Sequence, residues 1–172
     1  LAASACALMA GAASAEDVKI GILIGFTGPI ESLTGHMANA AEAAMAEVNA
    51  SGKAKNNYIS VRGDDTCTDA AAATAATERA VTAEGVKGII GGDCSGVTRA
   101  MLTNVAMPNG IVMVSPSATS PALTADPDNG LFFRTAPSDA REGEVMADIL
   151  TEKGVKSIAL TYSNSDYGKG LA

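Results

Sequence analysis

Short apolar runs alternate with helical patterns along this chain, and this alternation limits the folds that it can adopt. Each run is bounded by turn-forming residues and has the length of a buried strand. The runs cover residues 18–25, 58–63, 86–90 and 111–114. Between them, apolar residues recur at helical spacing over residues 35–50, from Asp69 to about Glu84, and after Cys94. This order predicts an α/β fold, a doubly wound parallel sheet with helices on both faces and right-handed crossovers.

A second, incomplete set of elements follows the fourth run. We expect a loop over residues 117–129, an extended segment over 131–135 that leads away from the first sheet, a helix from Asp139 and a strand over 157–162. Glu142 stands three residues after Asp139, which is a capping pattern. The apolar stripe of this helix comprises Val145, Met146, Ile149 and Leu150. We therefore expect one lobe over residues 16–135 and a second, similar lobe that only begins at 136–172.

The first fifteen residues differ in character from the rest. Residues 1–15 carry no charge and end in Ala13-Ser14-Ala15, and small residues at these positions fit the cleavage site of a signal peptidase. The stretch lacks an initiator Met and a basic flank, and it is too short to span a bilayer. We expect a partial signal peptide, a mature start at Glu16 and a periplasmic location. The alternative is a lipoprotein signal that uses Cys6, although Ala3 stands where such a signal normally has Leu.

Removal of the signal leaves two cysteines, Cys67 and Cys94. In an oxidising compartment they can pair, and closing a loop of this size stabilises a protein by about 3.5 kcal/mol on the chain-entropy model. The alternative is two buried free thiols. Asp64 and Asp65, two residues before Cys67, suit a metal or a phospho-acceptor, but a solvated turn or a helix N-terminal charge accounts better for them. A metal site is not expected, because the chain has a single His and no further ligands at suitable spacing.

The charge balance and the missing catalytic motifs exclude several classes of function. The chain holds 12 Lys and Arg against 19 Asp and Glu, a formal net charge of −7, and its basic residues form no cluster. This argues against a nucleic-acid partner. The sequence contains no G-x-S-x-G, Walker A or G-x-G-x-x-G pattern. His36 lies near a helix start, where a solvated role is expected. We therefore expect a protein that is not an enzyme and that holds no cofactor.

Two hydroxyl-rich loops follow the third and fourth expected strands. Ligands of open parallel sheets bind at the carboxyl ends of the strands. Residues 91–96 begin with two glycines, contain Ser95 and run directly into a helix, so this turn suits a carboxylate. The alternative is that Ser95 only caps the helix. Residues 115–121 contain four hydroxyl side chains, and the alternative here is an ordinary turn.

Six motifs in order give the chain a specific resemblance. They are Thr27-Gly28-Pro29 with residues 46–52, Asp64-Asp65-Thr66-Cys67, Gly92-Asp93-Cys94-Ser95, residues 115–124, Phe133-Arg134-Thr135 and residues 163–170. From Glu16 to Ala172 the chain resembles the N-terminal portion of the leucine/isoleucine/valine-binding family of type I periplasmic binding proteins. In that family the positions of Cys67 and Cys94 carry a lobe disulfide, and residues 133–135 match the first hinge crossing.

The resemblance implies roles for individual residues. Ser95 and Thr119 would hold a ligand carboxylate through hydroxyl and backbone N–H groups. The Ser117 carbonyl and the Thr119 hydroxyl would meet an ammonium, Ala118 belongs to the same loop, and Tyr167 would close over the ligand from the second lobe. Two departures stand out. The aromatic residue that leucine-binding relatives often have near position 33 is absent, and the acidic partner of the ammonium normally lies later in the second lobe.

The implied function is the periplasmic substrate-binding component of an ABC importer. Such a component captures an amino acid, branched-chain or related, between two lobes by hinge closure, the motion for which periplasmic binding proteins are the standard example. Its partners would be the membrane permease and ATPase of the importer, and we expect it to be a monomer. The alternatives are a sensor or receptor ectodomain of the same fold, or a binding protein for amides or small aromatic acids.

Overall fold

A parallel five-stranded sheet in the order β2-β1-β3-β4-β5 forms the centre of the molecule. The computed structural model describes residues 16–172, so the expected signal peptide lies outside the described residues. The strands are β1 Asp17–Ile24, β2 Asn57–Asp64, β3 Gly88–Gly91, β4 Val112–Ser115 and β5 Phe132–Arg134. The helices are α1 Glu31–Ala50, α2 Ala70–Thr82, α3 Ser95–Met101, the π-helical turn η1 Leu102–Ala106, α4 Ala122–Ala125, α5 Asp139–Glu152 and α6 Asp166–Leu171.

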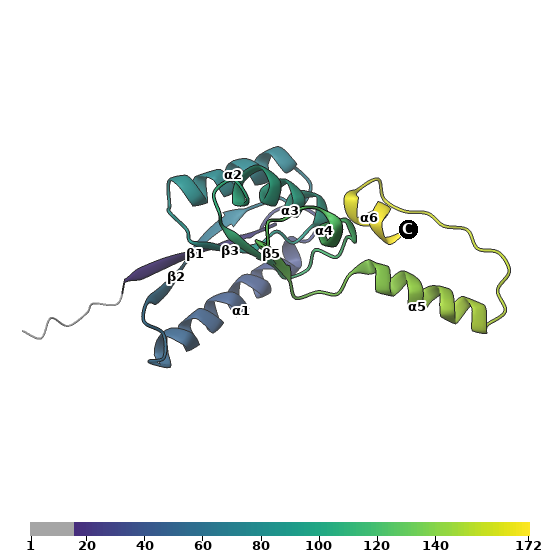
Figure 1. The fold of residues 1–172 in the computed structure, drawn as a ribbon, viewed down its shortest axis with the longest axis horizontal. Coiled ribbons are helices and arrows are strands. Elements are labelled where there is room, and N and C mark those ends of the chain that lie inside the picture. The colour runs from purple at the N-terminus through teal and green to yellow at the C-terminus, as the bar shows by residue number, and fades with distance from the viewer. Residues whose placement is uncertain (1–15) are drawn as a thin grey trace, which may run out of the picture.

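Helices cover both faces of this sheet, as the strand–helix alternation predicts (Figure 1). Successive side chains of β1 point to opposite faces, because strands have a two-residue period. Ile22 and Ile24 pack with Ala38 of α1. Leu23 packs on the other face with residues of α2 and α3, among them Ala73 and Met101. The two hydrophobic clusters define a doubly wound fold and confirm the predicted fold class.

The Ala-rich helix α2 begins where the sequence predicts. Asp69 precedes its first residue, and its Oδ1 accepts hydrogen bonds from the backbone N–H groups of Ala71, at 2.9 Å, and Ala72, at 3.0 Å. An aspartate in this position satisfies backbone donors that have no partner within the helix. The buried side of α2 consists of Ala73, Ala76, Thr77 and Ala80. These small side chains let the helix lie close to the sheet.

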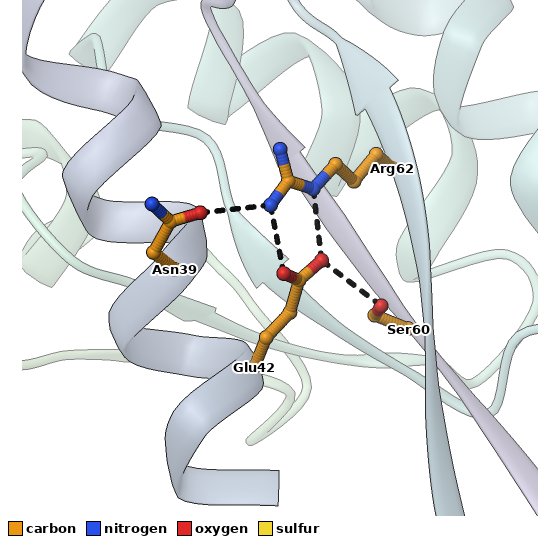
Figure 2. A network of polar contacts seen from close by, with 4 residues as sticks. All are labelled: Asn39, Glu42, Ser60 and Arg62. Carbon is orange, nitrogen blue, oxygen red and sulfur yellow. Dashed lines mark hydrogen bonds and ion pairs between the residues drawn. The ribbon is translucent and has the colours of Figure 1, made fainter. Parts of the chain in front are cut away.

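An exposed ion pair joins α1 to the edge strand β2 (Figure 2). Arg62 donates from Nε and Nη2 to the two carboxylate oxygens of Glu42, at 2.8 and 2.7 Å. Asn39 accepts a further bond from Arg62, and Ser60 donates to Glu42. The guanidinium group also lies 5.5 Å from the ring centroid of Phe26. Hydrogen bonding to Arg62 lowers the pKa of Glu42. This network links the helix to the strand at the surface, where such pairs contribute little to stability.

The segment at residues 131–135 departs from the sequence prediction. Instead of leading away from the sheet it contributes β5, which pairs in parallel with β4 through Met113 with Phe132 and Ser115 with Arg134. The Phe132 side chain is buried in the main hydrophobic cluster. Its burial accounts for the pairing, because it requires the segment to lie along the edge of β4.

Helix α5 starts at Asp139 as predicted, but the cap lies one residue earlier. Ser138 has extended backbone angles, and its side chain accepts a hydrogen bond from Ala140 N–H. Asp139 is the first helical residue, and its carboxylate accepts a bond from Thr119 of a distant loop. Because Ser138 occupies the cap position, Asp139 does not act as the cap.

The strand predicted over residues 157–162 does not form. These residues are not assigned to any strand, and their apolar side chains stay exposed, Ile158 at 60%. A strand needs a hydrogen-bonded neighbour, and no strand in the described part of the chain pairs with this segment. Val145, Met146 and Ile149 of α5 are exposed as well. Among residues 16–172, no helix has the length and apolar character needed to cross a membrane.

Candidate functional site

The loops that follow β3 and β4 meet at one edge of the sheet, and the backbone there is packed closely. Gly91, the last residue of β3, has φ +150°, and a Cβ built on it would lie 1.9 Å from the carbonyl oxygen of Leu23. Only glycine fits such an approach between neighbouring strands. The glycine therefore positions the turn from which Gly92, Asp93, Cys94 and Ser95 follow.

Ser95 is buried, with 2% of its surface exposed, and it is the first residue of α3. It does not cap the helix, because the preceding residue, Cys94, occupies the cap position. Its Oγ instead accepts a hydrogen bond of 3.1 Å from the backbone N–H of Ser120 in the loop after β4. The helix-cap alternative for Ser95 is therefore wrong, and the side chain connects the two loops.

The loop after β4 is held by its own hydroxyl groups. Ser115 Oγ donates to the Gly92 carbonyl at 2.6 Å and accepts from Ala118 N–H at 2.9 Å. Ser117 Oγ donates to the Asp93 carbonyl at 3.0 Å. These bonds fasten the loop to the turn after β3, so that the two loops form one unit rather than independent turns.

Arg134 of β5 supports the same loop from its other side. Its Nη1 donates to the carbonyls of Ala118, at 3.2 Å, and Ser120, at 2.9 Å. Its Nη2 donates to Thr124 Oγ1. Because the guanidinium group binds the carbonyl oxygens flanking Thr119, it fixes the backbone at that position. Sequence reasoning assigned Arg134 only to a hinge segment, since these partners become visible only when β5 is placed beside β4.

Thr119 makes two reciprocal bonds with Asp139, the first residue of α5. Thr119 Oγ1 donates to Asp139 Oδ2 at 2.9 Å, and Asp139 N–H donates to the Thr119 carbonyl at 3.0 Å. Asp139 is 5% exposed. Sequence reasoning did not place Asp139 in the site. No local pattern marks it, because the two residues are 20 positions apart and separated by a strand.

Helix α6, which carries Tyr167, lies at this same edge (Figure 1). A Cβ built on Gly170 would lie 2.8 Å from Ser120 Oγ, and Asp166 Oδ2 lies 3.9 Å from Arg99 Nη1 of α3. The Tyr167 side chain is 47% exposed. The structure thus brings Ser95 together with residues 117–119 and places the helix of Tyr167 beside them.

Asp65 and Asp93, in the turns after β2 and β3, form a buried carboxyl pair. Asp65 is 0% exposed and Asp93 is 4% exposed. Asp93 Oδ2 accepts from Gly25 N–H and Asp65 Oδ1 from Cys67 N–H, both at 2.8 Å. Burial, together with repulsion from the adjacent Asp93, raises the pKa of Asp65 from 3.8 to about 8. The expectation of a solvated turn is therefore wrong for Asp65, because the side chain is buried and accepts hydrogen bonds from the backbone N–H groups of Cys67 and Asp93.

Asp64, the preceding residue, has the opposite environment. Partial burial alone would raise its pKa, but hydrogen bonds from the Thr27 side chain and from the backbone N–H groups of Thr66, Thr27 and Phe26 lower it below 3.8. Adjacent side chains of a strand end point to opposite sides. Two neighbouring aspartates therefore differ in the direction of their pKa shift.

Cys67 and Cys94 form a disulfide, with their Cα atoms 5.1 Å apart. The prediction of a disulfide is confirmed, and the alternative of two free thiols is wrong. The bond joins the turn after β2 to the residue immediately before Ser95. It therefore fixes the position from which α3 begins.

Other features of the described residues offer less to a ligand. Among residues 16–172, no group of three or more His, Cys, Asp or Glu is placed to hold a metal ion. His36 is exposed on α1. A groove of about 330 Å³ lies between α1 and β2, but its polar groups are already paired. Asn49 bonds both backbone groups of Tyr58, and Glu42 bonds Arg62. We therefore place the candidate site at the strand ends.

Comparison with known proteins agrees with this geometry. The family model described as "Periplasmic binding protein" matches residues 17–172. The Leu/Ile/Val-binding protein of Escherichia coli (strain K12) is 35% identical over 162 residues, which cover 93% of this chain and 43% of that protein. A Leu/Ile/Val-binding protein homolog of Brucella melitensis is 33% identical over 100% of this chain and 47% of its own length. The chain thus spans less than half the length of these relatives.

Solved structures show the same fold. The branched-chain amino acid transporter substrate-binding protein of Streptococcus pneumoniae, in complex with isoleucine, superposes with a TM-score of 0.79 at 29% identity, over 91% of this chain and 44% of that one. A Rhodopseudomonas palustris solute-binding protein in complex with 4-hydroxybenzoate superposes with a TM-score of 0.78 at 18% identity, over 91% and 41%. The match over nearly the whole described chain shows that this protein belongs to the periplasmic binding protein family.

Proposed function

We propose that this chain forms the ligand-binding first lobe, and the start of the second lobe, of a periplasmic substrate-binding protein that delivers an amino acid to an ABC importer. The proposed boundaries are a signal peptide at residues 1–15, a first lobe at 16–135 and a second lobe from 136 onward. The relatives named above are more than twice as long as the segment they share with this chain, which supports a two-lobed protein. The disulfide supports an oxidising compartment.

The observation that carries this proposal is the set of hydrogen-bonding groups that the fastened loops leave unused. Ser95 Oγ accepts from Ser120 N–H, so its own proton remains free to be donated. Among the described residues, the backbone N–H of Thr119 has no acceptor. Two donors from neighbouring loops suit the two oxygens of a carboxylate.

The Thr119 side chain, in contrast to these two donors, offers a hydrogen-bond acceptor. A carboxylate such as that of Asp139 only accepts hydrogen bonds, so Thr119 Oγ1 must be the donor between the two side chains. The hydroxyl oxygen then offers only lone pairs to a ligand, and an ammonium group is a donor that fits them. The Ser117 carbonyl is a second acceptor for the ammonium. Tyr167 of α6 would close over the ligand when the two lobes come together.

The ligand we propose is an α-amino acid with an apolar side chain. The relatives at 33–35% identity are named for binding leucine, isoleucine and valine, and the solved structure at 29% identity holds isoleucine. The structure in complex with an aromatic acid is 18% identical, so it shows the fold alone. The partners we propose are the permease and ATPase of the importer, and we propose that the protein binds its ligand without converting it.

Calorimetric titration of the two-lobed protein with the twenty amino acids, benzoate and 4-hydroxybenzoate tests this proposal. We expect at least one aliphatic amino acid to bind, no binding of the aromatic acids, and recovery of the ligand unchanged. Thr119→Val should weaken binding about tenfold to over a hundredfold, because a hydrogen bond to a charged group contributes roughly 1.5–3 kcal/mol.

Ser120→Ala serves as the matched control in the same loop. The Ser120 side chain makes no hydrogen bond within the described residues, so its removal should change affinity by less than about twofold. Melting temperatures of both variants should match that of the unchanged protein. Equal affinities of the two variants, or a ligand without a carboxylate, would show that the site is misplaced.

A further inference from the structure

Asp139 is a buried carboxylate without a cationic partner in the described part of the chain. It is 5% exposed, and its side chain accepts one hydrogen bond, from Thr119 Oγ1. No Lys or Arg of residues 16–172 lies within ion-pair distance of it. A buried charge is strongly disfavoured unless it is paired and hydrogen-bonded. Among the described residues, the Asp139 carboxylate is therefore held by one hydroxyl donor at the start of α5, without a neighbouring cation.

The cations nearest to Asp139 along the chain are already engaged. Arg134 binds the carbonyls of Ala118 and Ser120 and the Thr124 hydroxyl. Arg141 is exposed and pairs with Glu144 one turn along α5. The positive end of the α5 dipole favours an anion at its first residue, but this contribution is small compared with the cost of a buried charge. A further positive group at this position would complete the charge balance.

We propose that Asp139 is a positioning residue that makes the site select a ligand with an ammonium group over a ligand with a carboxylate alone. By accepting the hydrogen bond that Thr119 Oγ1 donates, Asp139 leaves the lone pairs of that hydroxyl as acceptors for a ligand. Its negative charge adds electrostatic attraction for the ammonium, which a carboxylate without an amino group does not gain. This inference rests on the proposed function and assigns to Asp139 the preference of that site for a ligand with an ammonium group.

A structural role alone makes a different prediction. If Asp139 only fastened α5 to the loop after β4, its replacement would weaken every ligand by a similar factor. If it sets the ammonium subsite, replacement weakens amino acids while leaving their deaminated analogues almost unchanged. The ratio of the two affinities separates the two roles, and a general loss of stability does not change that ratio.

The experiment compares Asp139→Asn with the unchanged two-lobed protein, using L-leucine and 4-methylpentanoate, its analogue without the amino group. L-Isoleucine and L-valine are paired with 3-methylpentanoate and 3-methylbutanoate in the same way. We expect Asp139→Asn to weaken binding of the amino acids by tenfold or more and to change binding of the acids by less than threefold. Asp139→Glu, which keeps the charge, should restore part of the loss.

Asp148→Asn is the matched control, because Asp148 is an exposed aspartate of the same helix. The Asp148→Asn variant should bind L-leucine with unchanged affinity. Should Asp139→Asn fail to fold, Thr119→Val tests the same subsite and should lower the same affinity ratio. Equal losses for amino acids and deaminated acids would overturn the assignment of Asp139. If the unchanged protein binds none of these amino acids, the proposed function itself fails, which is a separate and distinguishable result.

Discussion

Replacing Asp65 by Asn should remove a pH dependence of stability that the buried carboxyl pair creates. Asp65 and Asp93 are neighbours in the turns after β2 and β3, and the pKa of Asp65 is raised by burial and by the neighbouring charge. Asn has nearly the same shape as the protonated carboxyl group but cannot ionise. At every pH, the Asn side chain therefore packs as the protonated Asp65 side chain does at low pH.

The magnitude follows from the size of the shift. Because the pKa of Asp65 rises from 3.8 to about 8 on folding, the folded chain keeps a proton that the unfolded chain has released between those values. The contribution of Asp65 to the free energy of unfolding is therefore complete below about pH 4 and is lost as the pH rises through about 8. Four pKa units correspond to a loss on the order of 5 kcal/mol. In a domain of this size that loss lowers Tm by roughly 10–20 °C.

The assay is the Tm of the ligand-free, disulfide-bonded protein at intervals from pH 5 to pH 9. We expect Tm of the unchanged protein to fall over this range more steeply than Tm of Asp65→Asn, which should be the more stable of the two at pH 9. Asp64→Asn is the matched control, because the pKa of Asp64 is lowered on folding. The stabilising effect of the ionised Asp64 is present above pH 4 and is lost as the pH falls below that value. Asp64→Asn should therefore be less stable than the unchanged protein by a constant amount from pH 5 to 9. Parallel profiles for Asp65→Asn and the unchanged protein would refute the reasoning.

Two further predictions concern the backbone and the disulfide. Gly91→Ala should lower the free energy of unfolding by more than about 3 kcal/mol, because the added Cβ meets the backbone of the neighbouring strand. Gly143→Ala, on the open face of α5, should instead raise the free energy of unfolding by roughly 0.5–1 kcal/mol. Chemical denaturation of both variants measures this, and similar effects would contradict the packing at β3. Replacing Cys67 and Cys94 by Ser should cost about 3.5 kcal/mol on the chain-entropy model. A double Ser variant whose unfolding midpoint is unchanged would show that the bond has no stabilising role.

The parts of the fold that depend on local sequence could be predicted from it. The spacing of apolar residues predicts β1 to β4 and α1 to α3, because each of these elements is specified by its own apolar residues. The cap at Asp69 is likewise a local signal. The membership of β5 was missed because its three residues carry no period, and only the burial of Phe132 beside β4 decides it.

In the candidate site, too, the features with a local sequence signal could be predicted and those that depend on a distant partner could not. Glycines and hydroxyl residues after β3 and β4 indicated where the loops would meet, since the carboxyl ends of parallel strands share one edge. The inward turn of Asp65 and the contact of Asp139 with Thr119 could not be predicted. Both depend on a partner from another element, and an aspartate beside a turn or at a helix start is solvated in most proteins.

The crystal structure of the two-lobed protein with a bound aliphatic amino acid tests the central claim most directly. We predict that the ligand carboxylate accepts hydrogen bonds from Ser95 Oγ and Thr119 N–H, each within about 3.2 Å, and that its ammonium donates to Thr119 Oγ1. Asp139 should keep its bond to the Thr119 hydroxyl in that complex. A ligand bound in the groove between α1 and β2, or one with its carboxylate facing Asp139, would contradict the account.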